Sequence, residues 1–143
     1  MAKILFYFIS FTWGLPLTLI GILVAAIISA CGYVPNGKYG YCWVFQVGRN
    51  WGGLNLGPVI ITSAPHDNNL MKHEHGHAIQ NCWFGPLFLI VVALPSAIRY
   101  WYRELKYIRK GKTPPTEYDA VWFEGSATRI GTKFIQKYFG EQV

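Results

Sequence analysis

The sequence predicts a mainly α-helical, membrane-embedded domain that carries one small β-hairpin. Three features support this fold class: an uncharged apolar run at residues 4–30, a turn-rich segment typical of short strands at 41–62, and a second apolar run at 81–98. Only 14% of the residues are charged and 52% are apolar. Soluble domains average about 25% charged residues, so the composition favours a membrane.

The chain has 143 residues, which predicts a single domain, 1–143, with one modest core. Its net charge is +6, and its cations follow apolar segments. This arrangement favours a lipid headgroup surface as partner over nucleic acid. The three cysteines, Cys31, Cys42 and Cys82, form no CxxC pair, so we expect neither a disulfide framework nor a cysteine metal site.

The first element, residues 4–30, is long enough for a tilted transmembrane helix. Its 27 residues rise about 1.5 Å each and can cross a hydrocarbon core of roughly 30 Å. Gly14 and Pro16 predict a kink in it. The alternative is a cleaved lipoprotein signal ending before Cys31, but this run is longer than a usual signal-peptide core.

The second element, residues 41–62, is predicted as a β-hairpin or two short strands. Tyr41–Val47 has the composition of a strand, Gly48–Gly53 that of a turn, and Leu54–Thr62 that of a second strand. Pro58 cannot donate to a sheet ladder, so we expect the second strand at an edge or a bulge.

Helices account for the rest of the chain. Residues 70–84 are predicted as a helix, because Asp67, Asn68 or Asn69 can cap its start and Gly85-Pro86 interrupts it. Residues 86–112 are predicted as an apolar and then basic helix. The apolar part, counted as 81–98, is at the lower limit for a span, so it crosses the membrane or re-enters as a broken helix. Residues 119–139 are predicted as the last helix.

His73 and Glu74 open an H-E-x-x-H pattern that ends at His77. On a helix, residues i and i+4 lie on one face, so both imidazoles can occupy corners of a tetrahedral zinc site. Glu74 follows the first histidine, where its carboxylate can take a proton from a metal-bound water as the general base. His75 is turned about 160° away from the two ligands, so we expect it not to bind the metal.

A catalytic zinc site needs a third protein ligand, and Glu124 is the predicted one. It lies in the helical stretch Trp122–Gly131 among apolar and small residues. An unpaired carboxylate is unfavourable there, and a metal ion would compensate it. The rival interpretation is a surface glutamate on an amphipathic helix. His66 lies upstream in a proline-containing loop and is a much weaker candidate.

H-E-x-x-H at 73–77 followed by E-x-x-A at 124–127 resembles the gluzincin metallopeptidases. Within that clan the chain is most similar to integral-membrane peptidases of the CAAX-prenyl-protease and heat-shock type, as a minimal version of them. Those proteins take their third ligand from an E-x-x-A-D-x-x-G-like helix, which Glu124, Ala127 and Gly131 match. Thr128 stands where that pattern has an aspartate, the partner of a zinc histidine.

The resemblance implies a Zn²⁺-dependent metalloendopeptidase with ligands His73, His77 and Glu124 and the general base Glu74. Its substrate would be a peptide or membrane protein, cleaved in the membrane or at its surface. Residues 54–62 would bind that substrate as an added strand, although an ordinary packed hairpin fits them equally well. The candidates for stabilising the oxyanion are Tyr118, Arg99, Tyr100 and His75.

Charge distribution predicts the orientation in the membrane. Every Lys and Arg except Lys3 lies in residues 32–80 or 99–143, and these must share one side for the ligands to meet. We therefore expect an integral protein of a bacterial-type cytoplasmic membrane, with its metal site on the cytoplasmic side and 81–98 re-entrant. Two alternatives remain: a non-catalytic protein with a structural or degenerate zinc site, and a metal-free membrane-binding module. The sequence does not indicate the oligomeric state.

Overall fold

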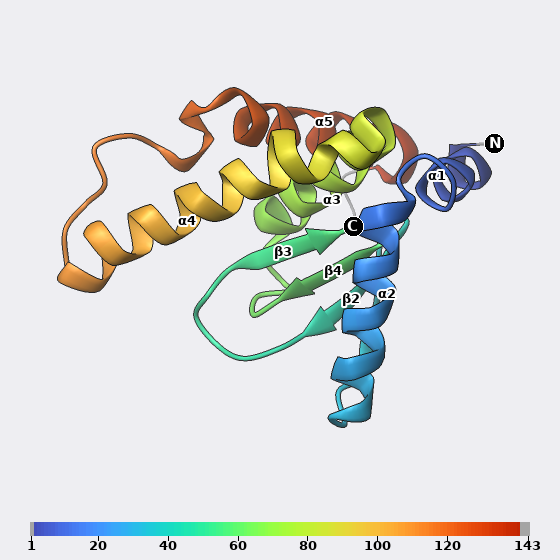
Figure 1. The fold of residues 1–143 in the computed structure, drawn as a ribbon, viewed down its shortest axis with the longest axis horizontal. Helices are drawn as coiled ribbons and strands as arrows, with labels where there is room; N and C mark the ends of the chain where they lie inside the picture. Colours follow the sequence, from blue (N-terminus) through green and yellow to red (C-terminus); the bar gives the residue numbers. More distant parts are fainter. Residues whose placement is uncertain (1, 141–143) are drawn as a thin grey trace.

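A four-stranded β-sheet lies between helices in the computed structural model, which describes residues 2–140 (Figure 1). The mainly helical fold with a small β part agrees with the sequence-based expectation. The elements in chain order are α1 (Ala2–Ser10), α2 (Leu15–Ala30), β1 (Pro35–Tyr39), β2 (Cys42–Gln46), β3 (Gly53–Leu56), β4 (Val59–Thr62), α3 (Asn68–Phe84), the 3-10 turn η1 (Gly85–Leu87), the π-helical segment η2 (Leu89–Ala93), α4 (Leu94–Lys106), the 3-10 turns η3 (Ile108–Lys110) and η4 (Tyr118–Ala120), and α5 (Trp122–Phe139).

Residues 4–30 form two helices and not the single helix expected from their hydropathy. α1 and α2 are bent by 89° at a short break. Pro16 lies in the first turn of α2, where its missing N–H is harmless, and Thr18 Oγ1 donates to the Ser10 carbonyl at 2.8 Å across the break. Within residues 2–140, no helix taken singly is both long and apolar enough to cross a membrane. Two bent pairs, α1 with α2 and residues 68–87 with 89–110, meet that criterion by length and composition.

The strands have the spatial order β1-β2-β4-β3, so β4 is central and β3 is an edge strand. β2 and β4 are parallel, whereas β3 and β4 are antiparallel. The expected hairpin between 41–47 and 54–62 is therefore wrong: β3 and β4 form the hairpin around Gly57-Pro58, and β1 adds a strand that the sequence did not suggest. Pro58 lies in the turn and not in an edge strand, and its carbonyl accepts the Trp43 N–H at 2.9 Å.

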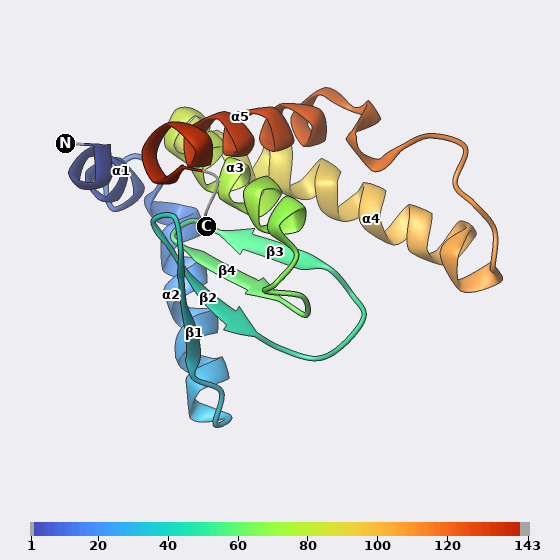
Figure 2. The same cartoon turned by 180° about the vertical axis from the view of Figure 1, so that it is seen from behind.

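Helices cover both faces of the sheet, which is why every residue of β4 is buried. Val59 and Ile61 pack in one core cluster with Leu17 of α2, while Ile60 packs in a second cluster with Met71 of α3. Successive side chains of a strand point to opposite faces, so α2 and α3 lie on opposite sides. Figure 2 shows α2 behind the strands and α5 lying over α3.

α3 and α5 pack at very short distance because glycines lie where they cross. A Cβ on Gly76 would lie 1.9 Å from the Ala127 carbonyl oxygen, and a Cβ on Gly131 would lie 1.8 Å from that of Lys72. No other residue type leaves room for this approach. The close crossing brings the first turn of α5, with Glu124, against the histidine face of α3.

The helix expected at 86–112 follows a 116° bend between residues 68–87 and 89–110, which agrees with the break predicted at Gly85-Pro86. It is helical over residues 89–110 but changes from the π-helical η2 through α4 to the 3-10 turn η3. Gly85 adopts a φ of +53°, and a Cβ there would lie 2.4 Å from the Trp13 ring. The chain after α3 therefore doubles back, which returns Glu124 to the side of the histidines.

Candidate metal centre

α3 begins where a capping side chain is available. Asp67 Oδ1 accepts the backbone N–H groups of Asn69 and Leu70 at 3.0 and 3.1 Å, so Asp67 is the N-cap among the three candidates. From this start, His73 and His77 lie one turn apart on the face of α3 that meets α5.

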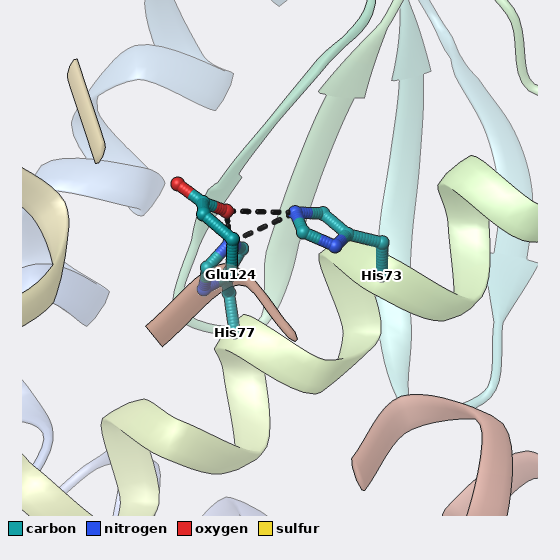
Figure 3. Close-up of side chains that lie close together, drawn as sticks. All are labelled: His73, His77 and Glu124. Atoms are coloured by element: carbon teal, nitrogen blue, oxygen red, sulfur yellow. Dashed lines mark hydrogen bonds and ion pairs between the residues drawn. The ribbon is translucent and has the colours of Figure 1, made fainter. Parts of the chain in front are cut away.

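Three buried side chains converge at this crossing, His73, His77 and Glu124 (Figure 3). The two Nε2 atoms are 3.1 Å apart, and Glu124 Oε2 lies 3.1 Å from Nε2 of His73 and 3.2 Å from Nε2 of His77. Ligand atoms of a tetrahedral zinc ion, with bonds of about 2.0–2.1 Å, are roughly 3.3 Å apart. The triangle therefore has the size that one such ion requires, and within residues 2–140 no other His, Cys, Asp and Glu side chains form a comparable group.

Gln80 fixes the tautomer of His77. Its Nε2 donates to the Phe123 carbonyl at 2.9 Å and to Ser126 Oγ at 2.7 Å, so its Oε1 is left facing His77 Nδ1 at 2.8 Å. An amide oxygen only accepts hydrogen bonds, hence His77 carries its proton on Nδ1. Its Nε2 presents a lone pair to the centre.

A hydroxyl and a carboxylate fix the tautomer of His73. Thr128 Oγ1 donates to Asp119 Oδ2 at 2.6 Å and lies 2.8 Å from His73 Nδ1. Because the hydroxyl proton is directed to the carboxylate, the Thr128 oxygen accepts from His73 Nδ1–H, and His73 Nε2 is unprotonated. The acid missing at position 128 is thus replaced by a threonine that relays to Asp119 on η4. Gly125 makes room for this turn, since a Cβ there would lie 2.6 Å from the Asp119 carbonyl oxygen.

In the neutral imidazoles, these hydrogen bonds leave the Nε2 lone pairs of His73 and His77 facing Glu124 Oε2. The other carboxylate oxygen of Glu124, Oε1, is buried and has no hydrogen-bond partner in the described part of the chain. A buried anion beside two lone pairs is unfavourable unless a cation joins them, so the residues present fit a divalent metal ion.

A cavity of about 840 Å³ adjoins the centre. His73, Glu74 and His77 line one of its walls, the edge strand β3 a second, and residues of η2 and α4 a third. A metal ion held by His73, His77 and Glu124 would therefore lie beside this open space. Burial raises the pKa of Glu74 to about 7, with His77 opposing and Glu124 adding to this effect. Gly53 of β3 lies against this side chain, because a Cβ on it would lie 2.7 Å from Glu74 Oε1.

His75 lies on the opposite face of α3, as expected, and takes no part in the centre. Its ring packs among Phe6, Tyr41 and Phe134, and its Nε2 accepts the Tyr41 N–H at 3.3 Å. Burial lowers the pKa of His75 to about 4, which keeps the ring neutral. His75 is therefore excluded as an oxyanion donor. His66 is exposed and does not belong to the ligand group.

Of the other oxyanion candidates, Tyr118 lines the cavity and has only a long side-chain contact, 3.5 Å from its Oη to Ser96 Oγ. Arg99 Nε donates to the Tyr118 carbonyl at 3.2 Å, and Tyr100 Oη donates to the Trp51 carbonyl at 3.1 Å. Tyr118 lines the cavity, and burial raises its pKa, so its O–H remains a donor.

Two supporting residues were not anticipated from the sequence. Gln80 follows His77 by three positions, so helical spacing alone could have identified it. Asp119 precedes Thr128 by nine positions, and no regular spacing connects the two, because the 3-10 turn η4 and the extended residue Val121 lie before α5.

Comparisons of the chain with models of known protein families, with curated proteins and with solved structures found no match. The resemblance to gluzincin membrane peptidases therefore rests on the motif residues at 73–77 and 124–131.

Proposed function

We propose that this chain is a zinc metalloendopeptidase whose ligands are His73, His77 and Glu124. One observation carries the proposal: the ligand atoms of three buried side chains lie within 4.8 Å of one another beside an open cavity that Glu74 also lines. Two imidazoles and one carboxylate are a donor set of catalytic zinc sites, whereas structural zinc sites are closed by four protein ligands.

Different side chains around the centre would carry out different steps of peptide-bond hydrolysis. When bound, zinc would polarise the scissile carbonyl and acidify a water molecule. Glu74 takes the proton from that water and delivers it to the leaving amine, a task for which a pKa near 7 is suitable. Tyr118 donates its O–H to the oxyanion that develops on the carbonyl.

The free edge of β3 suits an extended peptide. Ser63 N donates to the Gly52 carbonyl at 3.0 Å, which marks a hydrogen-bonded pair of the β3–β4 ladder. Because such pairs alternate, Gly53 and Asn55 turn their N–H and C=O groups to the free edge. A substrate that adds as a strand along β3 passes Gly53, whose missing side chain leaves it next to Glu74.

A membrane location is the second part of the proposal. α1 and α2 expose large apolar side chains, among them Ile4, Phe8 and Leu23, each more than 60% exposed. Together they contain one charged residue, Lys3, and as a bent pair they have the length and composition to enter a bilayer. The many Lys and Arg residues after α2 favour the cytoplasmic side for the metal centre.

The proposal is tested with Glu74→Gln, which keeps the shape of the side chain and removes the base. We expect cleavage of an unstructured protein substrate to fall by at least about 10²-fold, the usual contribution of a general base. Zinc content should remain at one ion per chain. Glu117→Gln, at an exposed glutamate outside the centre, is the matched control and should keep full activity.

Three results would count against the proposal. Glu74→Gln could cleave as fast as the wild type, or the wild type could retain its activity after complete removal of zinc. In the third case, wild-type protein with one bound zinc ion cleaves none of a broad peptide library, and the site is then structural.

A further inference from the structure

The outer face of α4 and η3 is a continuous apolar surface that nothing in the described chain covers. No residue of α4 is buried, and Figures 1 and 2 both show this helix extending away from the sheet. Six large side chains follow one another along this face at helical spacing, each more than half exposed. We name them the α4 stripe: Leu94, Ile98, Trp101, Tyr102, Leu105 and Ile108.

The same helix also lines the cavity. Ala93, Ala97 and Tyr100 contribute to the cavity wall, and so do Trp101 and Ile108 of the stripe itself. Each stripe side chain is nevertheless more than half exposed, so packing onto its own domain does not account for its apolar character. The cavity therefore adjoins whatever covers the stripe.

The charges beside the stripe indicate what covers it. Residues 94–112 contain six cations and one acid, Glu104, which pairs with Arg109 at 3.4 Å. Lys106, Lys110 and Lys112 are exposed and lie next to the stripe or directly after it. Aliphatic and aromatic side chains on one face, flanked by cations that can reach outward, match the acyl and headgroup layers of an anionic bilayer.

We propose that α4 lies in the plane of an anionic phospholipid bilayer, with the α4 stripe inserted among the lipids and Lys106, Lys110 and Lys112 at the headgroups. This docking places the cavity directly beside the lipid surface, because Trp101 and Ile108 belong to both. It restricts access to peptide segments next to the membrane. Only this last consequence rests on the proposed peptidase function; the lipid contact does not.

The test places an environment-sensitive fluorophore on the stripe. Full-length protein with Leu105→Cys, in a Cys31→Ser and Cys82→Ala background, is labelled and reconstituted into phosphatidylcholine vesicles with or without phosphatidylglycerol. Lys133→Cys, at an exposed position of α5, is the matched control. We expect a blue shift and strong quenching by nitroxide-labelled lipid at residue 105, greater in anionic vesicles, and neither effect at residue 133.

A second variant tests the role of charge. Lys110→Glu with Lys112→Glu should weaken the anionic-lipid dependence of the signal at residue 105. The proposal is overturned if label at 105 is quenched no more than label at 133. It is also overturned if the blue shift appears without lipid and grows with protein concentration, because the stripe is then covered by a second copy of the chain. Peptidase activity is not read, so failure here is distinguishable from failure of the proposed chemistry.

Discussion

Removing one hydroxyl, in Thr128→Val, should weaken metal binding without disturbing the ligands themselves. Valine has the shape of threonine but cannot accept the hydrogen bond from His73 Nδ1 that is 2.8 Å long. His73 is only 9% exposed, so water does not easily take over this role. Loss of such a supporting partner typically reduces metal affinity by about 10- to 100-fold.

We expect Thr128→Val near the upper end of that range, which corresponds to roughly 2.7 kcal/mol of binding free energy. Asp119→Asn should lie near the lower end, because the hydroxyl still faces His73. Affinity is measured by competition with a chromophoric chelator, and thermal unfolding of the metal-free variants shows whether the fold is intact. Thr132→Val, one turn further along α5, is the matched control and should bind zinc as the wild type does.

A rescue experiment separates the relay from a packing effect. Thr128→Asp in an Asp119→Asn background puts the carboxylate where the related motif has it, and should restore most of the lost affinity. The reasoning is refuted if Thr128→Val binds zinc within about twofold of wild type, well below the range usual for such partners. Equal losses in Thr128→Val and Thr132→Val would refute it as well.

Two further substitutions test the catalytic and structural parts of the account. Tyr118→Phe should lower turnover on the order of 10²-fold, as removal of one oxyanion donor does, with zinc content unchanged. Tyr33→Phe, at an exposed tyrosine outside the centre and the α4 stripe, should be neutral. Full activity of Tyr118→Phe would remove this residue from the mechanism. Gly76→Ala should lower the free energy of unfolding by about 3 kcal/mol or more, since the new Cβ would lie 1.9 Å from the Ala127 carbonyl oxygen. It should also lose zinc, whereas Asn69→Ala should do neither; a stable Gly76→Ala with bound zinc would contradict the helix crossing described above.

The site could be predicted further than the fold because helical spacing is a local property. His73 and His77 are placed by one turn of α3, and the carboxylate of Glu124 was identifiable from its apolar and small neighbours. Asp119 could not be found, since it reaches Thr128 through a 3-10 turn whose geometry depends on Gly125. Asp119 takes the role of the aspartate that the related motif has at position 128.

The order of the strands could not be predicted from the sequence. Residues 41–47 and 54–62 are both apolar and separated by a glycine-rich turn, so a direct hairpin was the simplest pairing. In the structure β4 lies between β2 and β3, because the chain reverses at Gly57-Pro58 and both faces of β4 pack against apolar helices. Likewise, Gly14 and Pro16 signalled a kink, but the 89° bend depends on packing of that break against α3, where Asn81 Nδ2 donates to the Gly14 carbonyl at 3.4 Å.

X-ray absorption at the zinc edge of the loaded protein tests the central claim most directly, because it reports the ligand atoms without requiring a substrate. We predict one zinc ion per chain with only nitrogen and oxygen neighbours at about 2.0–2.1 Å, including the outer-shell scattering of two imidazoles. Glu124→Gln should lose the carboxylate contribution and most of the affinity. Sulfur neighbours near 2.3 Å, or scattering from a single imidazole, would contradict a centre built from His73, His77 and Glu124.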